Sequence, residues 1–232
     1  MMSEPIRQHE GVIDKFIGDA IMAFWGPPFV GADQHAAKAC LAAIDFVKTL
    51  AVFRSEMPEL MGIKRGLPEI DIQIGIASGD VVIGNIGADT SRSYTVMGVT
   101  VNLASRLESV NKVYGTRLLV SEETAKRAAD SIATREIDSI AVAGKNDAVR
   151  IFEILGKNGG LDDEVLRLRH RFEEGLAAYR RRDWIAAAAA FSDCAAIAPN
   201  DGPSKVFFDR VNRLRADPPS PDWDGVWRLS EK

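Results

Sequence analysis

Apolar residues in the N-terminal part of the chain recur with two different periods, which predict strands and helices in alternation. Residues 12–17 and 20–25 are short apolar runs of strand composition. Between them, Gly18-Asp19 suits a two-residue hairpin turn of type II′, which places Gly first. Residues 70–77 (IDIQIGIA) alternate between apolar and polar, as a half-buried strand does. Shorter strands are predicted at 81–86, 94–97, 117–120, 137–142 and 149–155.

Helical periodicity separates these strands. Asp33 is placed to cap a helix through about residue 53, and a second helix is expected after Gly98, with Gly115 as its terminator. Ser121 is placed to cap a short third helix. Strands interleaved with helices predict an α/β or α+β sandwich. The apolar stripe of the first helix consists of Ala36, Cys40, Ala43, Val47 and Leu50.

The composition changes at residues 156–160 (GKNGG), a glycine-rich stretch that predicts a linker. It divides the chain into a first domain at 1–156 and a helical C-terminal extension at 161–232. In the extension, apolar residues recur at spacings of three and four, which is the stripe of an amphipathic helix. That stripe consists of Val165, Leu168, Phe172, Leu176 and Tyr179.

Two more helices are predicted in this all-α extension, one from Asp183 to Pro199 and one at about 203–215. The Pro-rich end carries Trp223 and Trp227, which are predicted to dock onto the helices. The extension also has the spacings of a single tetratricopeptide-like (TPR-like) repeat. Because one such repeat cannot bury its own apolar face, we expect a docked cap or a partner surface. The residues at the repeat's spacings are Gly175, Ala187, Phe191 and Pro199.

Composition narrows the class of protein. The 232 residues carry 27% charged and 46% hydrophobic side chains, enough for one or two packed domains. The formal net charge is −4, and no long basic run indicates a nucleic acid or an anionic membrane as partner. No apolar run approaches the ~18 residues of a membrane span, and the N-terminus is not a signal peptide. With Cys40 and Cys194 in helical patterns, reduced buried thiols and a cytoplasmic location are expected.

The predicted hairpin carries charges that its apolar composition does not require. Residues 15–26 read KFIGDAIMAFWG, with Lys15 in the first strand and Asp19 at the tip. An acid in the turn itself, with a lysine three residues before the glycine of that turn, is unusual in so apolar a stretch and favours a functional role. The alternative is that Asp19 is only a turn residue and Lys15 a solvated strand charge.

A second stretch with chemical potential is residues 94–108, YTVMGVTVNLASRLE. Its predicted helix places Asn102 and Arg106 four residues apart on one face, with Leu103 and Leu107 on a separate apolar face. An amide and a planar guanidinium in this arrangement can bind an oxyanion or a phosphate. The alternative is an exposed helix face with an ordinary surface arginine.

Together the two stretches resemble the class III nucleotidyl cyclases. That family shows K-x-x-G-D in a hairpin, here residues 15–19, followed by aromatic-[DT]-x-x-G-x-x-V-N-x-A-x-R, here residues 94–106. The order and spacing match, and the likeness covers residues 2 to about 155. The resemblance implies the family's α+β ferredoxin-like sandwich. The extension, which ends in DWDGVWRL, is similar to the C-terminal extension of some bacterial adenylate cyclases.

The resemblance also implies a reaction and a role for each motif residue. The family converts a nucleoside triphosphate to a cyclic nucleotide and pyrophosphate, by in-line attack of the ribose 3′-hydroxyl on the α-phosphate with two Mg²⁺ or Mn²⁺ ions. By position, Asp19 corresponds to a metal-bridging aspartate, Asn102 to the residue that orients the ribose, and Arg106 to the one that stabilises charge on the phosphate. Lys15 and Thr95 correspond to the adenine-type purine-reading pair, which favours ATP over GTP and makes a guanylate cyclase the weaker interpretation.

The family's site lies between two catalytic domains. Asp19 would come from one domain, and the purine pair, Asn102 and Arg106 from the other. A single such chain therefore implies a homodimer with two equivalent sites, whose partners are ATP and a second cyclase domain.

One departure from the family pattern concerns the metal. No F-x-D strand, the source of the family's first metal-binding Asp, precedes the hairpin, and residues 3–9 resemble the end of the second helix that follows that strand. We therefore expect a domain without its first strand and helices, from a truncated reading frame, a misplaced start codon or a gene remnant. Asp19 would be the one protein ligand, and the hairpin would keep an unpaired apolar edge.

A second departure lies before the last strand of the first domain. Where the family often shows V-K-G-K, residues 142–145 read VAGK, so Ala143 replaces a lysine that contacts the triphosphate. Lys145 either compensates as a substrate-binding residue or is a plain loop charge. These departures support a competing interpretation, in which the chain is a catalytically inactive interaction or regulatory module that pairs with a full-length cyclase.

Overall fold

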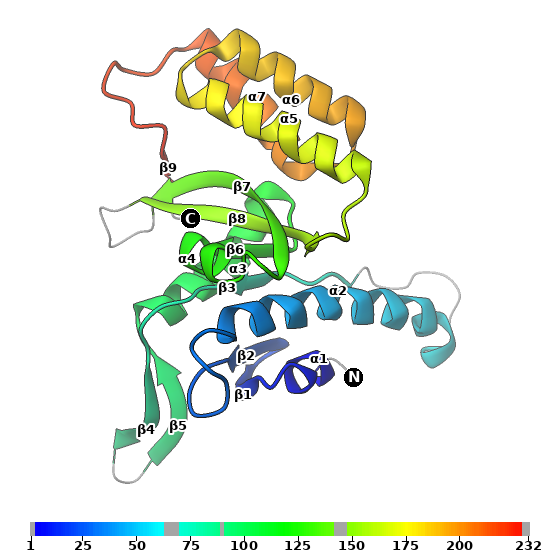
Figure 1. Ribbon diagram of the computed structural model, residues 1–232, viewed down its shortest axis with the longest axis vertical. Helices are drawn as coiled ribbons and strands as arrows, with labels where there is room; N and C mark the ends of the chain where they lie inside the picture. Colours follow the sequence, from blue (N-terminus) through cyan, green and yellow to red (C-terminus); the bar gives the residue numbers. More distant parts are fainter. Residues whose placement is uncertain (1–2, 63–69, 89–90, 142–147, 229–232) are drawn as a thin grey trace.

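A computed structural model describes residues 3–62, 70–88, 91–141 and 148–228 (Figure 1). The centre of the molecule is a five-stranded sheet. Its strands, in spatial order, are β3 (Ile74–Ile76), β6 (Leu118–Ser121), β8 (Ala148–Lys157), β7 (Ile132–Ala141) and β9 (Trp227–Arg228). The β3–β6 and β7–β9 pairs are parallel, and the two pairs that β8 makes are antiparallel.

The side chains of β6 show why the sheet is covered on both faces. All four residues of this strand are buried. Leu118 and Val120 pack with α2 (His35–Leu60), whereas Leu119 belongs to the core that contains α3 (Val99–Tyr114). Because successive side chains of a strand point to opposite faces, α2 and α3 lie on opposite sides of the sheet. The predicted α+β sandwich is confirmed.

The hairpin predicted at the N-terminus is present. β1 (Val12–Ile17) and β2 (Ala20–Phe24) pair antiparallel, and Gly18 has a positive φ of 61°, as a turn with Gly first requires. Among the described residues the two strands pair only with each other. Phe16 and Ile17 are 63% and 59% exposed. The expected unpaired edge and exposed apolar side chains are therefore confirmed.

A further strand pair and two short helices belong to this part of the molecule. The antiparallel pair β4 (Val82–Ala88) and β5 (Ser91–Met97) extends away from the body of the molecule (Figure 1). The short helix α1 (Glu4–Gln8) packs against α2, and α4 (Glu122–Arg127) begins at a cap formed by Ser121, whose hydroxyl accepts the N–H of Thr124, as predicted.

The start of α2 differs from the prediction. Its N-cap is Gln34 and not Asp33, and Gln34 makes no side-chain capping bond. The carbonyl of Gly31 accepts the backbone N–H groups of both Gln34 and His35. The backbone of the turn therefore pairs these two donors at the helix start without a capping carboxylate. The predicted stripe is nevertheless confirmed, with Ala36, Cys40, Ala43 and Leu50 buried and Val47 half-buried.

The strand predicted at 70–77 is limited to Ile74–Ile76. Before it, the carboxylate of Asp71 accepts the N–H of Ile72 at 2.9 Å and forms an ion pair with Arg117 at 2.8 Å. Local side-chain bonds of this kind compete with a sheet ladder. The ladder begins where the Ile74 N–H donates to the Arg117 carbonyl at 2.8 Å.

Three helices form a layer over β7 and α3: α5 (Asp163–Arg180), α6 (Trp184–Ile197) and α7 (Gly202–Ala216) (Figure 1). Their apolar side chains share one core with the sheet and α3. The sheet therefore covers the face for which the sequence predicted a cap. The predicted stripe is confirmed, with Leu168, Phe172, Leu176 and Tyr179 buried.

The end of the chain corrects the expectation of an all-α extension. Trp227 lies in β9, which pairs in parallel with β7 at Ile140. Trp223 packs edge-on against Tyr179 and Trp184, with ring centroids 5.2 and 5.6 Å away. The predicted docking of both tryptophans is confirmed, one on the helices and the other on the sheet and the Arg210 side chain.

A buried ion pair joins α7 to the sheet. Arg210 Nη1 donates to Asp138 Oδ2 at 2.6 Å, and the same oxygen accepts the Tyr114 hydroxyl at 2.5 Å. The Arg210 and Asp138 side chains are 2% and 1% exposed. Burial and the neighbouring Asp138 charge raise the pKa of the Tyr114 hydroxyl, which keeps it a neutral donor.

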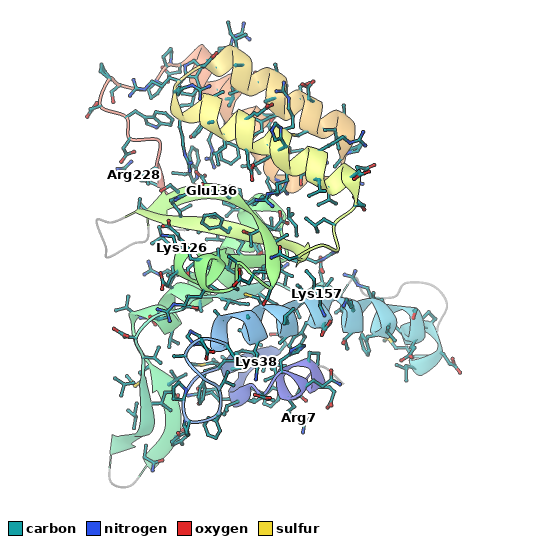
Figure 2. All side chains as sticks on the ribbon, in the orientation of Figure 1. Arg7, Lys38, Lys126, Glu136, Lys157 and Arg228 are labelled. Carbon is teal, nitrogen blue, oxygen red and sulfur yellow. The ribbon has the colours of Figure 1, made fainter. Side chains whose placement is uncertain are left out.

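A second set of ionic contacts lies along β7. Arg135 ion-pairs with Glu153 at 2.7 Å and with Asp201, at the start of α7. Glu136, labelled in Figure 2 where β7 faces the helical layer, is held by Arg150 and by Arg180 of α5. Although burial alone would raise it, hydrogen bonds from these two arginines hold the pKa of Glu136 below its ordinary value.

No helix in the described ranges is both long enough and apolar enough to span a bilayer. Cys40 and Cys194 are buried and unbridged, as expected for reduced thiols. Burial raises the pKa of the Cys40 thiol to about 12 and that of Cys194 to about 11, so neither is a ready nucleophile at neutral pH.

We predict that Arg210→Met destabilises the protein by about 3–5 kcal/mol, because it leaves the Asp138 carboxylate buried without its cation. Denaturant unfolding followed by circular dichroism measures this cost. Arg215→Met is the control, because Arg215 is exposed in the last turn of the same helix, and we expect a change within about 0.5 kcal/mol. Equal costs for the two variants would contradict the importance of the buried pair.

Candidate functional site

The structure brings the two predicted purine-reading residues to one carboxylate. Thr95, on β5, donates its hydroxyl to Asp14 Oδ2 at 2.9 Å, and Lys15 Nζ lies 3.5 Å from the same oxygen. The Asp14 side chain is 1% exposed and the Lys15 side chain 41% exposed. The buried Asp14 carboxylate therefore contacts both the buried Thr95 hydroxyl and the Lys15 ammonium group, which is partly exposed to solvent.

A β-bulge explains how neighbouring residues of β1 can both serve this site. Ile13 pairs with Ala23 and Lys15 with Met22, so Asp14 is an extra residue opposite no partner. In a regular strand the side chains of Asp14 and Lys15 would point to opposite faces. Bulges re-aim side chains in this way and occur often beside active sites.

The predicted phosphate-binding residues lie on α3. Asn102 and Arg106 are both exposed, whereas Leu107 is buried and Leu103 packs against the core. The two predicted faces of this helix are therefore confirmed. The helix is held close to the sheet at Gly75, where an added Cβ would lie 2.1 Å from the carbonyl oxygen of Ala104.

The turn between β5 and α3 connects the purine-reading and phosphate-binding segments. Gly98 has a φ of 152°, and an added Cβ would lie 3.2 Å from the Asp80 carbonyl oxygen. A side chain at this position would be strained and crowded. Gly98 is therefore the residue that allows the chain to turn from β5, which carries Thr95, into the first turn of α3.

Asp19 is exposed at the tip of the β1–β2 hairpin, and an added Cβ on Gly18 would meet no atom within 4 Å. The open tip allows a large anion or cation to approach. Within the described ranges, however, no group of three or more His, Cys, Asp or Glu side chains is arranged to hold a metal ion. These residues by themselves do not fit the family's two-metal site. Lys145 and Ala143 lie outside the described residues.

Sequence reasoning missed Asp14. Its signal was an acid in the middle of an otherwise apolar strand, VIDKFI, directly before the lysine of the motif. Strand periodicity alone assigns Asp14 to the face opposite Lys15. Only the bulge, which could not be predicted from the sequence, allows Asp14 to contact both Thr95 and Lys15.

Comparison with known proteins identifies the family. Residues 2–156 match the family model described as the adenylate and guanylate cyclase catalytic domain. The chain therefore belongs to this family, as the two motifs predicted.

Two relatives are named adenylate cyclases. The chain is 35% identical to adenylate cyclase 1 of Rhizobium meliloti (strain 1021) over 178 residues, which is 77% of this chain and 25% of that protein. It is 38% identical to an adenylate cyclase of Anabaena cylindrica over 156 residues, 66% of this chain and 30% of that protein. The chain thus spans less than a third of the length of either relative.

Solved structures support the cyclase fold. The adenylyl cyclase CyaB from P. aeruginosa is 36% identical with a TM-score of 0.59, and the match covers 69% of this chain and 80% of that one. The guanylyl cyclase Cya2 is 28% identical with a TM-score of 0.54, over 69% of this chain and 78% of that one. The family's catalytic fold is thus present, and the likeness to both kinds of cyclase leaves the purine to be decided by the site itself.

We predict that Thr95→Val destabilises the protein by about 1–3 kcal/mol, because the buried Asp14 loses its hydroxyl donor while the shape of the side chain is retained. Thermal and denaturant unfolding measure the loss. Thr100→Val is the matched control, since its hydroxyl donates to the Asp80 carbonyl at an exposed site, and we expect a change within about 0.5 kcal/mol. A Thr95→Val cost no larger than the control's would contradict the buried bond.

Proposed function

We propose that the chain is an adenylate cyclase-type domain that binds ATP and contributes to its conversion to cyclic AMP and pyrophosphate. In this reaction the ribose 3′-oxygen forms a bond to the α-phosphorus, and the bond to the pyrophosphate oxygen breaks in line. The observation that carries the proposal is the convergence of Lys15 and Thr95 on one carboxylate, joined through Gly98 to the helix with Asn102 and Arg106.

The preference for adenine follows from donor and acceptor chemistry. An ammonium group such as Lys15 is donor-only and pairs with an acceptor ring nitrogen, while the Thr95 hydroxyl has lone pairs for the exocyclic amine. Guanine presents a carbonyl and a ring N–H at the corresponding positions, which reverses both requirements. The names of the relatives from R. meliloti and A. cylindrica agree with this assignment.

The proposed phosphate site uses the exposed face of α3. Arg106 offers a planar fork of donors to phosphate oxygens, and such preorganised donors stabilise charge that develops during phosphoryl transfer. Asn102, one turn earlier, is assigned to the ribose. Both side chains are exposed, so a triphosphate can reach them.

The metal requirement limits what residues 1–232 do by themselves. The family's Mg²⁺ or Mn²⁺ ions would supply Lewis-acid activation when bound. Asp19 is the candidate ligand, but the described residues hold no further acid grouped with it. We therefore propose ATP binding by this chain, with efficient ring closure only when another cyclase domain completes the site.

We further propose that the site lies between this chain and a second cyclase domain, either another copy of the chain or a full-length relative; only the relative would add the family's other metal-binding Asp. Exposed apolar side chains support this assignment, because large apolar side chains that gather on exposed segments commonly mark interfaces. They lie at the hairpin tip and at the junction of β5 with α3, the two segments that carry the site. These side chains are Phe16, Ile17, Tyr94, Met97 and Val99, each at least half exposed.

A non-catalytic module remains the second candidate, and one observation favours it: the described residues lack a metal-binding cluster. In that case the chain would regulate a full-length cyclase through the same apolar surface. The TPR-like character of α5 and α6 remains a prediction, to which the close packing of Gly175 against Phe191 gives support.

We predict that the purified chain binds ATP more tightly than GTP, and that Arg106→Ala weakens ATP binding about tenfold or more through loss of charge-assisted hydrogen bonds. Isothermal titration calorimetry in Mg²⁺ measures both affinities. Lys112→Ala, an exposed cation in the last turn of the same helix, is the control and should leave binding nearly unchanged.

Cyclic AMP formation in Mn²⁺ tests the catalytic part of the proposal with the same proteins. We expect little turnover from the chain by itself. Turnover that is abolished by Arg106→Ala would support the assigned site. Robust turnover that survives both Arg106→Ala and Asp19→Ala would overturn it.

We predict that Met97→Glu weakens self-association, because it places a charge in the exposed apolar surface. Sedimentation velocity over a range of concentrations measures the effect. Lys205→Glu, at an exposed lysine of α7 in the C-terminal layer, is the control. Mixing the chain with a full-length cyclase separates the two candidates: a mixed dimer with raised turnover supports site completion, and one with lowered or unchanged turnover supports the regulatory module. Absence of any complex, with itself or with the relative, would contradict both.

A further inference from the structure

The Asp14 carboxylate is only half satisfied by the fold. Its Oδ2 accepts the Thr95 hydroxyl at 2.9 Å and lies 3.5 Å from Lys15 Nζ. Its Oδ1 is buried and has no hydrogen-bond partner among the described residues. A buried acceptor without a donor costs free energy. A purely structural acid would be expected to find donors for both oxygens, so the arrangement at Asp14 calls for another explanation.

We propose that Asp14 is a positioning residue that makes the Thr95 hydroxyl an obligatory hydrogen-bond acceptor and thereby sets the purine preference. The inference rests on the proposed ATP-binding function and deepens it. It assigns a role to a residue that the motif comparison leaves out, and it concerns how the adenine is read and not whether it is bound.

The physical basis is a count of protons. A threonine hydroxyl carries one hydrogen and two lone pairs, whereas an ionised carboxylate is acceptor-only. In the Thr95–Asp14 bond the hydrogen must therefore lie on the threonine side and point at Asp14. The Thr95 oxygen then has only lone pairs to offer a base. It accepts from an amine and repels a carbonyl oxygen.

The same carboxylate restrains Lys15. A lysine ammonium group has three donors on a flexible side chain, so without a partner its position would be poorly defined. The ion pair with Asp14 holds the ammonium group beside Thr95, in a strand whose bulge aims both side chains at the same place. The two groups then present one donor and one acceptor, which is the complement of the adenine edge formed by N1 and the 6-amino group.

The experiment compares three nucleotides that differ at purine position 6. ATP carries an amine there and inosine triphosphate a carbonyl, which brings a hydrogen onto N1, whereas purine riboside triphosphate carries only hydrogen at position 6 and keeps N1 as an acceptor. Calorimetric affinities for all three are measured in Mg²⁺ with the wild-type chain and with Asp14→Asn. An asparagine amide can donate to Thr95, which frees the hydroxyl hydrogen to serve a carbonyl. Asp130→Asn, an exposed acid without a part in the site, is the control.

We expect Asp14→Asn to lower the ratio of ATP to inosine triphosphate affinity about tenfold, the equivalent of one lost hydrogen bond of this kind. Purine riboside triphosphate keeps the N1 acceptor for Lys15 but has no amine to donate to Thr95, so its binding should weaken less than that of ATP, through loss of the Lys15 restraint alone. Thr95→Val added to Asp14→Asn should change the ratio little further, because both act through one hydroxyl.

Equal weakening of all three nucleotides by Asp14→Asn would overturn the inference, since it would show a structural role only. An unchanged ratio would overturn it as well. If Asp14→Asn is unfolded at the assay temperature, Asp14→Glu replaces it, because the longer side chain moves the carboxylate while keeping its charge, and the same ratio is read. A wild-type chain that binds no ATP would refute the proposed function itself. ATP binding that depends on Arg106 but not on Asp14 would refute only this inference.

Discussion

The buried ion pair between Arg210 and Asp138 holds the C-terminal helical layer against the central sheet. Removing an arginine and an aspartate from water is costly unless each finds partners. Here Asp138 accepts from both Arg210 and the Tyr114 hydroxyl, while Arg210 Nε has no hydrogen-bond partner among the described residues. Tyr114 is the last residue of α3, and Asp138 lies in the centre of β7. One polar cluster thus fixes the C-terminal layer, the sheet and the helix of the proposed phosphate site relative to one another.

The middle and the start of α3 are positioned by contacts of another kind. Gly75 allows the helix backbone to approach β3 closely, and Gly98 allows the chain to turn from β5 into the helix. The hairpin β1–β2 is then linked to β5 by the Thr95–Asp14 bond. Backbone proximity places the phosphate-binding residues, whereas a single buried carboxylate places the purine-reading ones. The two parts of the proposed site therefore differ in their sensitivity to substitution.

Much of this arrangement could be predicted from the sequence because the determinants are local. The hairpin follows from Gly18, the faces of α3 from the spacing of Leu103 and Leu107, and the helix stripes from apolar periodicity. The family motifs added the site residues. The position of Asp14 could not be predicted, because a bulge is a property of the strand pair and not of one strand. The shortened β3 has a similar cause, since Asp71 engages Arg117, which is distant in sequence.

The glycine-rich stretch at 156–160 predicts a linker between independent domains, yet the apolar core runs across it. Leu107, Ile137 and Ile140 on one side pack in the same cluster as Phe172 and Phe207 on the other. A recombinant fragment ending at residue 156 would leave these side chains against water, together with an unpaired Asp138. Conversely, a molecule bound to the C-terminal helices would contact a layer that packs directly against α3. The extension lies beyond the residues that match the family model, yet in its packing it belongs to the same folded unit.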